Sequence, residues 1–306
     1  MSLSVFLGFI LDTLSLGSLY ALLALGLVLV YGIMQLVNFA YGEYIMVGAF
    51  ALYFLTRFAN LPWLLAGVVA VLIAALVGFL SEVIAFRPFR GRSLDALLVS
   101  SFAVSVILQN SALIGITPRP KAIPYPEKIF DYKVNLLGVH TSMRSFIFIG
   151  TTLILLLALV LLMKKTTLGV AMRAASENFV TARLMGVPAN LVISTAFILS
   201  GLLAGVFSLF WTVLLGQVSY TIGAAPLLIG FIAVVIGGMH SLPGAVAGGF
   251  IYAAIANFFN LAFGQGWLPN HLSIFSEAFM FIVVIVFLVL KPEGLIRGNY
   301  AEERVG

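Results

Sequence analysis

The feature that most constrains this chain is a series of long apolar runs that carry almost no charge. Residues 3–34 are apolar except for Asp12 and small polar side chains, and similar runs cover residues 62–85, 94–115, 146–163, 191–213 and 273–290. A helix needs about 20 apolar residues to cross a bilayer. Charged residues make up 9% of the chain, against about 25% in a soluble domain. The sequence therefore predicts an integral membrane protein.

Two shorter apolar stretches interrupt this series. Residues 36–56 contain Asn38, Gly42 and Glu43, and residues 225–237 are short for a span. Irregular backbone at membrane depth occurs where it is buried in protein or lines a cavity. We predict an all-α polytopic membrane protein, a single transmembrane domain over residues 1–306 with about eight transmembrane helices. The short broken helices are expected in two inverted-repeat-like halves.

The N-terminus, M-S-L-S-V-F-L-G-F-I, has no basic region and no small-residue cleavage site. We interpret it as the start of the first span rather than a signal peptide. Residues 3–34 exceed what one perpendicular span requires. They fit either one long tilted helix or an entry segment followed by a span from about Gly17.

Basic residues indicate which ends of the spans face the cytosol. The motif R-P-F-R-G-R at 87–92, the pair Lys164 and Lys165, and the tail from Lys291 to Arg297 all carry excess positive charge, as cytosolic loops do. The formal net charge of +5 therefore does not indicate nucleic-acid binding. Residues 116–145 fall on the opposite side. Their four prolines within nine residues predict an extended or strand-like periplasmic loop rather than a helix.

The largest polar interruption on the cytosolic side is residues 172–190, M-R-A-A-S-E-N-F-V-T-A-R-L-M-G-V-P-A-N. We interpret it as one short helix, in which Arg173 and Glu177 can pair four residues apart and which Gly186 ends. An apolar stripe at helical spacing is formed by Met172, Ala175, Phe179 and Ala182. The segment is either an ordinary solvated loop or a coupling helix by which a soluble motor engages the membrane domain.

No enzyme motif is present in the sequence. It contains no G-x-x-x-x-G-K-[ST] phosphate loop and no G-x-S-x-G motif, and its histidines, His140, His240 and His271, are scattered. There are no cysteines, which excludes disulfides and thiolate metal sites. We expect no catalytic residues, no metal site and no cofactor bound by this chain.

Polar residues within apolar surroundings are the remaining candidates for function. Glu43 is an ionisable residue in an otherwise apolar region, which by default suggests a functional site. Glu43 and Asn38 could face a central path, or they could cap a helix at the break. Glycine pairs at G-x-x-x-G spacing, which let helices approach closely, occur at Gly201 and Gly205 and at Gly244 and Gly248.

Several motifs, taken together and in order, resemble a known family. They are G-S-L-Y-A-L-L-A-L-G-L-V-L-V-Y-G-I-M-Q-L-V-N-F-A-Y-G-E at 17–43, A-F-R-P-F-R at 85–90, L-G-V-A-M-R-A-A-S-E-N at 168–178 with A-R-L-M-G-V at 182–187, V-V-I-G-G-M-H-S-L-P-G-A-V-A-G-G at 234–249, and K-P-E-G-L at 291–295. The chain resembles the branched-chain amino acid ABC transporter permeases, in particular their shorter, LivH-like subunit.

The resemblance implies a non-catalytic permease subunit of an ATP-driven importer in a bacterial inner membrane. It implies a second permease (a paralogue or another copy of the chain), two cytosolic ATPase subunits that use the ATP, and a periplasmic substrate-binding protein. Residues 172–190 become the expected ATPase-docking segment. The residues expected to serve this coupling are Arg173, Glu177, Asn178, Arg183 and Gly186.

The same resemblance implies a substrate path, expected to involve Asn38, Tyr41, Gly42, Glu43, Ile229 and Asn257. Many family members have histidine where Tyr41 stands, lysine where Ile229 stands and an acid near Asn257. These neutral positions weaken the case for a fully ionised substrate. Branched-chain or other hydrophobic amino acids are the expected cargo, with urea, short amides or aromatic acids as alternatives within the family. A stand-alone secondary transporter or channel is the alternative of another class, and a membrane-embedded enzyme the weakest.

Overall fold

The computed structural model describes residues 3–90, 93–136, 139–267, 269–291 and 294–296. Its helices, including short 3-10 and π segments, are α1 Leu3–Met34, α2 Tyr41–Arg57, α3 Trp63–Ser81, η1 Glu82–Phe86, η2 Arg87–Phe89, α4 Leu94–Gly115, α5 Glu127–Phe130, α6 Met143–Lys165, α7 Thr167–Glu177, α8 Phe179–Leu184, α9 Ala189–Leu215, α10 Ala224–Gly237, α11 Leu242–Gly264, η3 Asn270–Phe275 and α12 Ser276–Leu290. Four short strands are β1 Lys121–Ala122, β2 Lys133–Leu136, β3 Val139–Ser142 and β4 Gln217–Val218. The predicted helical membrane fold is confirmed.

The number of spans is less clear-cut than the sequence suggests. By length and composition, six helical stretches among the described residues can cross a membrane: Val5–Met34, Trp63–Phe89, Leu94–Gly115, Met143–Lys165, Ala189–Leu215 and Leu242–Gly264. The apolar helices α10 and α12 are shorter, and α2 has 17 residues. The count of about eight and the relation between two halves therefore stay predictions. Residues 3–34 form one continuous helix rather than an entry segment and a separate span.

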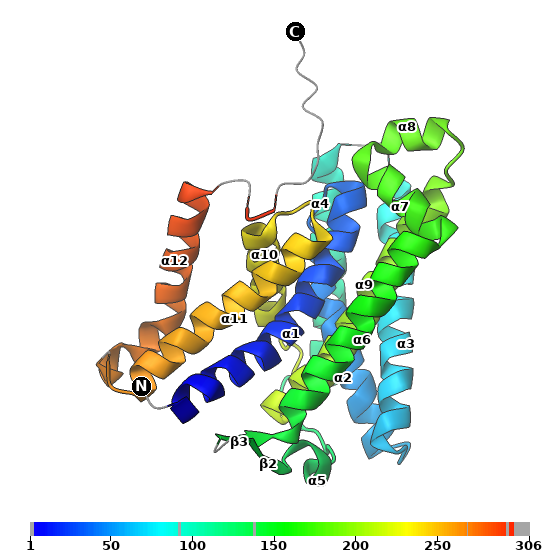
Figure 1. Ribbon diagram of the computed structural model, residues 1–306. Coiled ribbons are helices and arrows are strands. Elements are labelled where there is room, and N and C mark those ends of the chain that lie inside the picture. Colours follow the sequence, from blue (N-terminus) through cyan, green and yellow to red (C-terminus); the bar gives the residue numbers. More distant parts are fainter. Residues whose placement is uncertain (1–2, 91–92, 137–138, 268, 292–293, 297–306) are drawn as a thin grey trace.

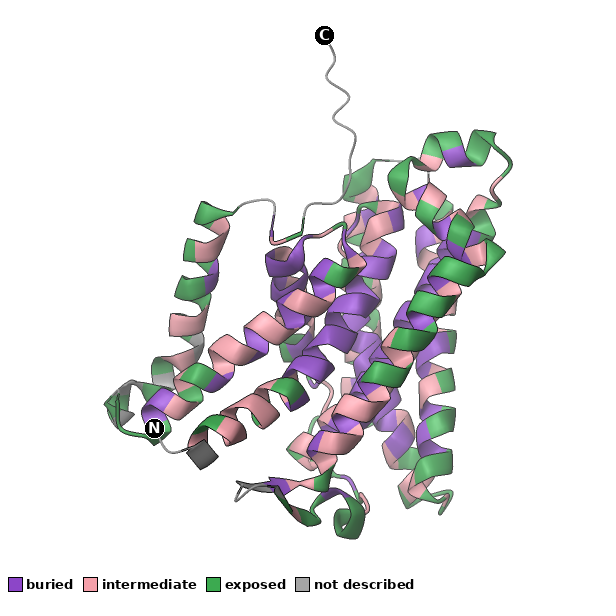
Figure 2. Cartoon of the chain, in the orientation of Figure 1, coloured by how far each residue is buried: buried purple, intermediate pink, exposed green. Residues whose placement is uncertain are grey.

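Helix α1 lies at the centre of the bundle. It packs against α6, α9, α10 and α11, while α3 packs against α2 and α9. Figure 2 shows the purple, buried segments concentrated on α1 and the helices around it, whereas α4, α6 and α12 show much green. The exposed side chains on these outer helices are largely apolar, including Ile107, Leu153 and Val289. A hydrophobic exterior around a hydrophobic core is what a lipid environment requires.

The basic clusters lie at one end of the molecule, as the orientation argument expects. Arg90 donates a hydrogen bond to Asn190 Oδ1 at 2.7 Å, so the loop after α3 meets the start of α9. The backbone N–H of Leu295 binds the Ile236 carbonyl, which brings the tail to the end of α10. Figure 1 shows α7 and α8 at this end, with α5, β2 and β3 at the other. Arg92 and Arg297 lie outside the described residues.

The loop at 116–145 is mostly extended, with two small antiparallel pairings. β1 pairs with β4, and β2 pairs with β3. The loop also contains α5, one helical turn that the sequence did not predict. Phe130 of α5 is 3% exposed and contacts Trp63, with 5.1 Å between ring centroids. This anchoring explains why a short helix forms within a proline-rich segment.

Candidate functional site

Between α1 and α2 the chain breaks at residues 35–40. Gln35 has φ of 51°, a left-handed conformation that ends α1. Asn38 then holds the turn: its Oδ1 accepts a hydrogen bond from the Ala40 N–H at 3.0 Å, and its carbonyl accepts from the Tyr41 N–H at 3.2 Å. Asn38 is 2% exposed. The break is therefore an ordered turn in which Leu36, Asn38 and Ala40 are buried in protein, as irregular backbone at membrane depth requires.

The predicted path residues near this break are brought together. The Asn38 amide donates to the Tyr44 hydroxyl at 3.3 Å. Glu43, in the first turn of α2, is 5% exposed and accepts a hydrogen bond from Ser105 of α4 at 3.0 Å. An acid so deeply buried is costly unless hydrogen-bonded. Tyr41 is fully buried, and its hydroxyl has no hydrogen-bond partner among the described residues.

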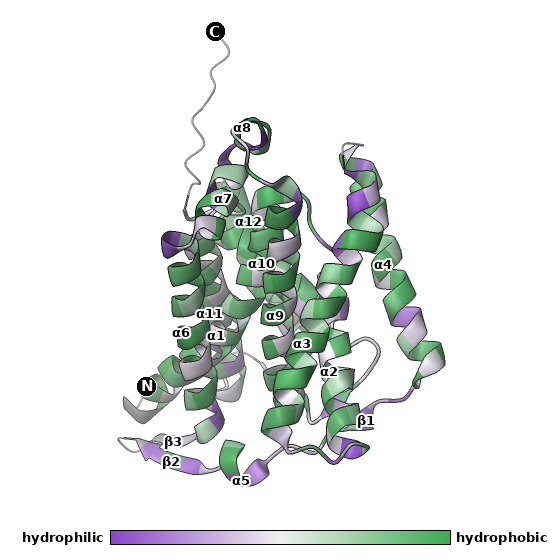
Figure 3. Ribbon diagram, turned by 90° about the vertical axis from the view of Figure 1, so that its right-hand side faces the viewer, coloured by the Kyte–Doolittle hydropathy of each residue, from purple (hydrophilic) through white to green (hydrophobic). Residues whose placement is uncertain are grey.

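Helix α4 stands largely apart from the bundle and is joined to the break by few contacts. The Phe39 and Phe102 rings stack with 4.1 Å between centroids, and Ser105 binds Glu43. In Figure 3, α4 lies to one side of the other helices. A displacement of α4 would therefore change the surroundings of Glu43 directly.

The two short helices α2 and α10 begin next to each other. A Cβ added to Gly42 would lie 2.7 Å from the carbonyl oxygen of Gly223, the residue before α10. Only glycine allows backbones to approach so closely. Figure 3 shows α10 above α2, so they lie in different halves of the molecule. Two short helices starting from a shared point form the kind of discontinuity that transporters use at substrate sites.

The other two predicted path residues lie elsewhere. Ile229 is half-buried on α10 and packs against the core cluster that includes Leu23 and Leu27. Asn257 donates a hydrogen bond to Thr13 Oγ1 at 3.3 Å, which links α11 to the first half of α1. Among the described residues, no hydrogen bond joins either side chain to the break. The structure therefore groups four of the six predicted residues, namely Asn38, Tyr41, Gly42 and Glu43.

The segment predicted as one helix at 172–190 is instead two helices. α7 ends at Glu177 and α8 begins at Phe179. Asn178 between them has φ of −152° and ψ of 100°, and its Oδ1 accepts the Thr181 N–H at 2.9 Å. The single-helix prediction is wrong because Asn178 offers the backbone an N-cap in place of the next helical turn. Gly186, with φ of 89°, follows the end of α8.

The apolar stripe of this segment faces inward on both helices. Met172, Ala175 and Ala182 are 3%, 2% and 6% exposed. Arg173, Glu177 and Arg183 are exposed, and no ion pair joins Arg173 to Glu177 in the part of the chain that the structure describes. The predicted pairing of these two residues is therefore not seen. Their charges are available to groups outside this chain.

An exposed apolar surface on α8 was not predicted from the sequence. Val180, Leu184 and Met185 are 68%, 83% and 82% exposed at the end of the molecule that carries the basic clusters. Residues four apart share a helix face, so Val180 and Leu184 lie together. The sequence contains these apolar residues, but within one continuous helix they do not stand out as a separate exposed face. Exposed apolar side chains that gather on one face can form an interaction surface.

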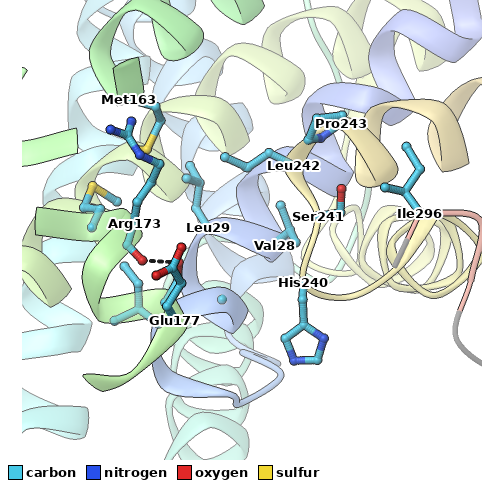
Figure 4. Close-up of a pocket in the computed structure, with 14 residues that line it drawn as sticks. Val28, Leu29, Met163, Arg173, Glu177, His240, Ser241, Leu242, Pro243 and Ile296 are labelled. Atoms are coloured by element: carbon cyan, nitrogen blue, oxygen red, sulfur yellow. Dashed lines mark hydrogen bonds between the residues drawn. The ribbon is translucent and has the colours of Figure 1, made fainter. Parts of the chain in front are cut away.

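A cavity of about 460 Å³ opens beside α7. Its walls come from the end of α1, from α6 and α7, from the turn between α10 and α11, and from Ile296 of the tail. Figure 4 shows Glu177 and His240 on different sides of it, with Leu29 and Leu242 between them. Partial burial lowers the pKa of His240 from its usual value, which favours the neutral imidazole. The cavity is therefore bordered by α7, by the end of α1 and by the start of α11.

A buried charge cluster at the end of α3 was also missed. Glu82 is 0% exposed and binds Arg87, Arg90 and Ser194. It begins η1, a π-helical segment, and such segments often mark functional sites. From the sequence, Glu82 was one acid at the end of a span, with nothing to show that α9 covers it.

The glycine pairs lie at helix contacts within the chain. A Cβ on Gly201 would lie 2.7 Å from the Ala74 carbonyl oxygen, and one on Gly205 would lie 2.8 Å from Val71 Cα, both on α3. Gly244 and Gly248 lie against α10, beside Gly237 and Ala233. No group of three His, Cys, Asp or Glu residues that could hold a metal ion is found among the described residues.

Most of the sequence matches known proteins. Residues 9–290 match the family described as "Branched-chain amino acid transport system / permease component". The chain is 29% identical over 293 residues to the branched-chain amino acid permease BraD of Pseudomonas aeruginosa, covering 92% of this chain and 93% of BraD. It is 30% identical to LivH of Escherichia coli, covering 92% of both chains, and 31% identical to a probable LivH of Methanocaldococcus jannaschii, covering 91% and 88%. A solved chain of PsaBC from Streptococcus pneumoniae, in complex with a Fab, is 17% identical with a TM-score of 0.45, covering 92% and 90%.

Proposed function

Because the chain belongs to the permease family of branched-chain amino acid transport systems, we propose that it is the membrane subunit of an ATP-driven importer for branched-chain or other hydrophobic amino acids. In this proposal it forms the substrate path together with a second permease, in a bacterial inner membrane. Two cytosolic ATPases supply the energy, and a periplasmic protein delivers the substrate.

The exposed apolar surface on α8 is the observation that carries the coupling part of this proposal. Val180, Leu184 and Met185 would dock into a groove of the ATPase, and Arg173 and Arg183 on the same two helices would meet acidic groups at its rim. Apolar anchors within a charged rim are the usual anatomy of a protein interface. A separate ATPase is required because the sequence has no phosphate loop of its own.

The path part of the proposal rests on the break at residues 35–40. Asn38, Glu43 and the unpartnered hydroxyl of Tyr41 supply polar groups where α2 and α10 begin side by side. Movement of the docked helices would rock the spans between states open to either side. Glu43 is held by Ser105 of the loosely attached α4, so its exposure can change when α4 moves.

The substrate assignment comes from the relatives and from the chemistry of the break. The named relatives transport branched-chain amino acids, and the residues around the break offer hydrogen bonds with a single acid, Glu43. A small zwitterion with an apolar side chain suits such surroundings better than a multiply charged solute. Within the family, urea, short amides or aromatic acids are the alternative cargo.

Reconstitution tests this function. The chain is co-expressed with the permease, ATPase and binding-protein genes of its own operon, and the complex is placed in liposomes with ATP inside. We expect uptake of radiolabelled leucine, isoleucine or valine that requires both ATP and the binding protein. Uptake driven by a proton gradient without ATPases would instead favour a stand-alone secondary transporter. Failure of the chain to co-purify with the ATPases would contradict the proposal.

A further inference from the structure

Glu82 is the best-connected buried acid in the described part of the chain, and the proposed function does not use it. Its Oε2 accepts from Ser194 Oγ at 2.7 Å and from Arg87 Nη2 at 3.1 Å. Its Oε1 accepts from Arg87 Nε at 3.3 Å and from Arg90 Nη2. Arg90 continues the network to Asn190 Oδ1 at 2.7 Å. The Glu82 cluster, formed by these five residues, joins the end of α3 to the start of α9.

A fully buried carboxylate gives little net stability, because losing its hydration offsets most of the attraction to its partners. Breaking such a cluster is nevertheless costly, since one charge is left buried and alone. The cluster therefore favours one particular arrangement of α3 and α9. The π-helical segment η1, which Glu82 begins, contributes to that arrangement: it buries Glu82 completely while Ile84 of the same segment is 69% exposed.

On one side the Glu82 cluster is tied to the proposed docking segment. Asn190 and Ser194 lie in the first two turns of α9, which begins at Ala189, directly after α8 and its exit turn at Gly186. Four residues lie between Met185, which follows the end of α8, and Asn190. A displacement of α8 therefore reaches the start of α9 through a very short connection.

On the other side the Glu82 cluster is tied to the break between α1 and α2. Ser81 precedes Glu82 directly, and its hydroxyl donates a hydrogen bond to the Val77 carbonyl at 2.7 Å. Helix α3, which Ser81 ends, packs against α2, and the Ser81 side chain lies near the hydroxyl of Tyr44. The same hydroxyl accepts the hydrogen bond from Asn38, the residue that holds the turn at the break. Tyr44 is fully buried on α2 and directly follows Glu43 in the sequence. Neighbouring side chains thus lead from the start of α9, through Glu82 and Ser81, to Tyr44 and the proposed substrate path.

We propose that Glu82 is a positioning residue that transmits movement of the docking segment to the substrate path, through the contacts of Ser194 and Asn190 on one side and of Ser81 and Tyr44 on the other. This inference rests on the proposed function. α9 and α3 move together because the Glu82 cluster holds their ends, and the movement reaches Asn38 because Tyr44 contacts both Ser81 and Asn38. A contiguous network of this kind can carry coupling, and measured coupling is the evidence required.

The test measures leucine taken up per ATP hydrolysed by the reconstituted full complex. Glu82→Gln keeps the shape of the side chain and removes its charge, and Tyr44→Phe removes only the central hydroxyl. We expect both to lower uptake per ATP at least about fivefold, the lower end of typical coupling between sites, while ATPase subunits still co-purify. Asp95→Asn is the matched control: Asp95 is an exposed acid in the first turn of α4, at the same end of the molecule. It is expected to leave the ratio unchanged.

Glu82→Gln separates transmission from direct damage to the path, because it leaves the hydrogen bond between Asn38 and Tyr44 in place, whereas Tyr44→Phe removes it. A rescue experiment uses the absence of native cysteines. Arg90→Cys with Asn190→Cys breaks the Glu82 cluster, and a short bifunctional thiol reagent then restores the connection. We expect low uptake per ATP before cross-linking and recovery afterwards.

The outcomes are distinguishable from failure of the proposed function. If the unaltered complex shows no ATP-dependent uptake, the proposed function itself is wrong. If it transports, and assembled Glu82→Gln and Tyr44→Phe complexes keep its uptake per ATP, the inference is overturned. If Glu82→Gln does not assemble, recovery of uptake per ATP in the cross-linked double cysteine variant decides instead. An unchanged ratio after cross-linking of the double cysteine variant would also count against it.

Discussion

The close contact between α3 and α9 can be tested with a pair of glycine substitutions. Gly201 lies inside α9, and a Cβ there would come 2.7 Å from the Ala74 carbonyl oxygen and 2.8 Å from Ala75 Cα. Both are backbone atoms, so the helices themselves must separate. Gly150 lies inside α6 with nothing within 4 Å of an added Cβ. Replacing either glycine with alanine gains about 0.5–1 kcal/mol of helix stability, so the difference between the two variants isolates the steric cost.

That cost is about 1–3 kcal/mol for inserting a methyl group into a well-packed interior. It corresponds to a change of roughly 5- to 150-fold in the unfolding equilibrium. The assay is thermal unfolding of each variant purified in detergent. We expect Gly150→Ala to melt at or above the temperature of the unaltered chain, and Gly201→Ala to melt below it. Equal stability of the two variants would refute the close approach of α9 to α3.

Two further predictions concern the proposed path and the docking segment. Glu43→Gln should abolish most uptake while the protein reaches the membrane at normal levels. Ser105→Ala, which removes one hydrogen bond of about 1 kcal/mol, should lower uptake less. Normal uptake by Glu43→Gln would show that Glu43 has only a structural role. Charge reversal by Arg173→Glu or Arg183→Glu should lower ATP-dependent uptake at least about tenfold, which corresponds to about 1.4 kcal/mol of docking free energy. The control Lys291→Glu, at the same end of the molecule, should not lower it. Equal uptake by all three variants would show that these arginines are not part of the coupling surface.

Much of the fold could be predicted from the sequence because apolar length is a direct signal in a membrane. The run at 94–115 coincides with α4, Leu94–Gly115. The basic clusters predicted that the loop after α3 and the segment before α9 share one end of the molecule, and the contact between Arg90 and Asn190 places them together. The break at Asn38 was predicted from one asparagine, one glycine and one acid in an apolar stretch, and the structure shows it as a buried turn.

What could not be predicted depends on contacts between distant segments or on local competition. Asn178 ends α7 and starts α8, because its side chain caps Thr181 more favourably than it continues the helix. The hydrogen bond from Asn257 to Thr13, 244 positions away in the sequence, could not be predicted. The burial of Glu82 could not be predicted, because its hydrogen-bond donor Ser194 is 112 positions away in the sequence. No pattern within one segment reveals such pairs.

The central claim is that a cytosolic ATPase docks on the helix pair α7 and α8, and site-directed cross-linking tests it most directly. The native chain has no cysteine, so a single Leu184→Cys at an 83% exposed position of α8 can carry a photoreactive thiol reagent. Ile129→Cys, on α5 at the opposite end and 56% exposed, is the control. In membranes that contain the assembled complex, we predict a cross-linked product with the ATPase from Leu184→Cys and none from Ile129→Cys. A complex that transports leucine with ATP but gives no ATPase cross-link from Leu184→Cys would contradict the account.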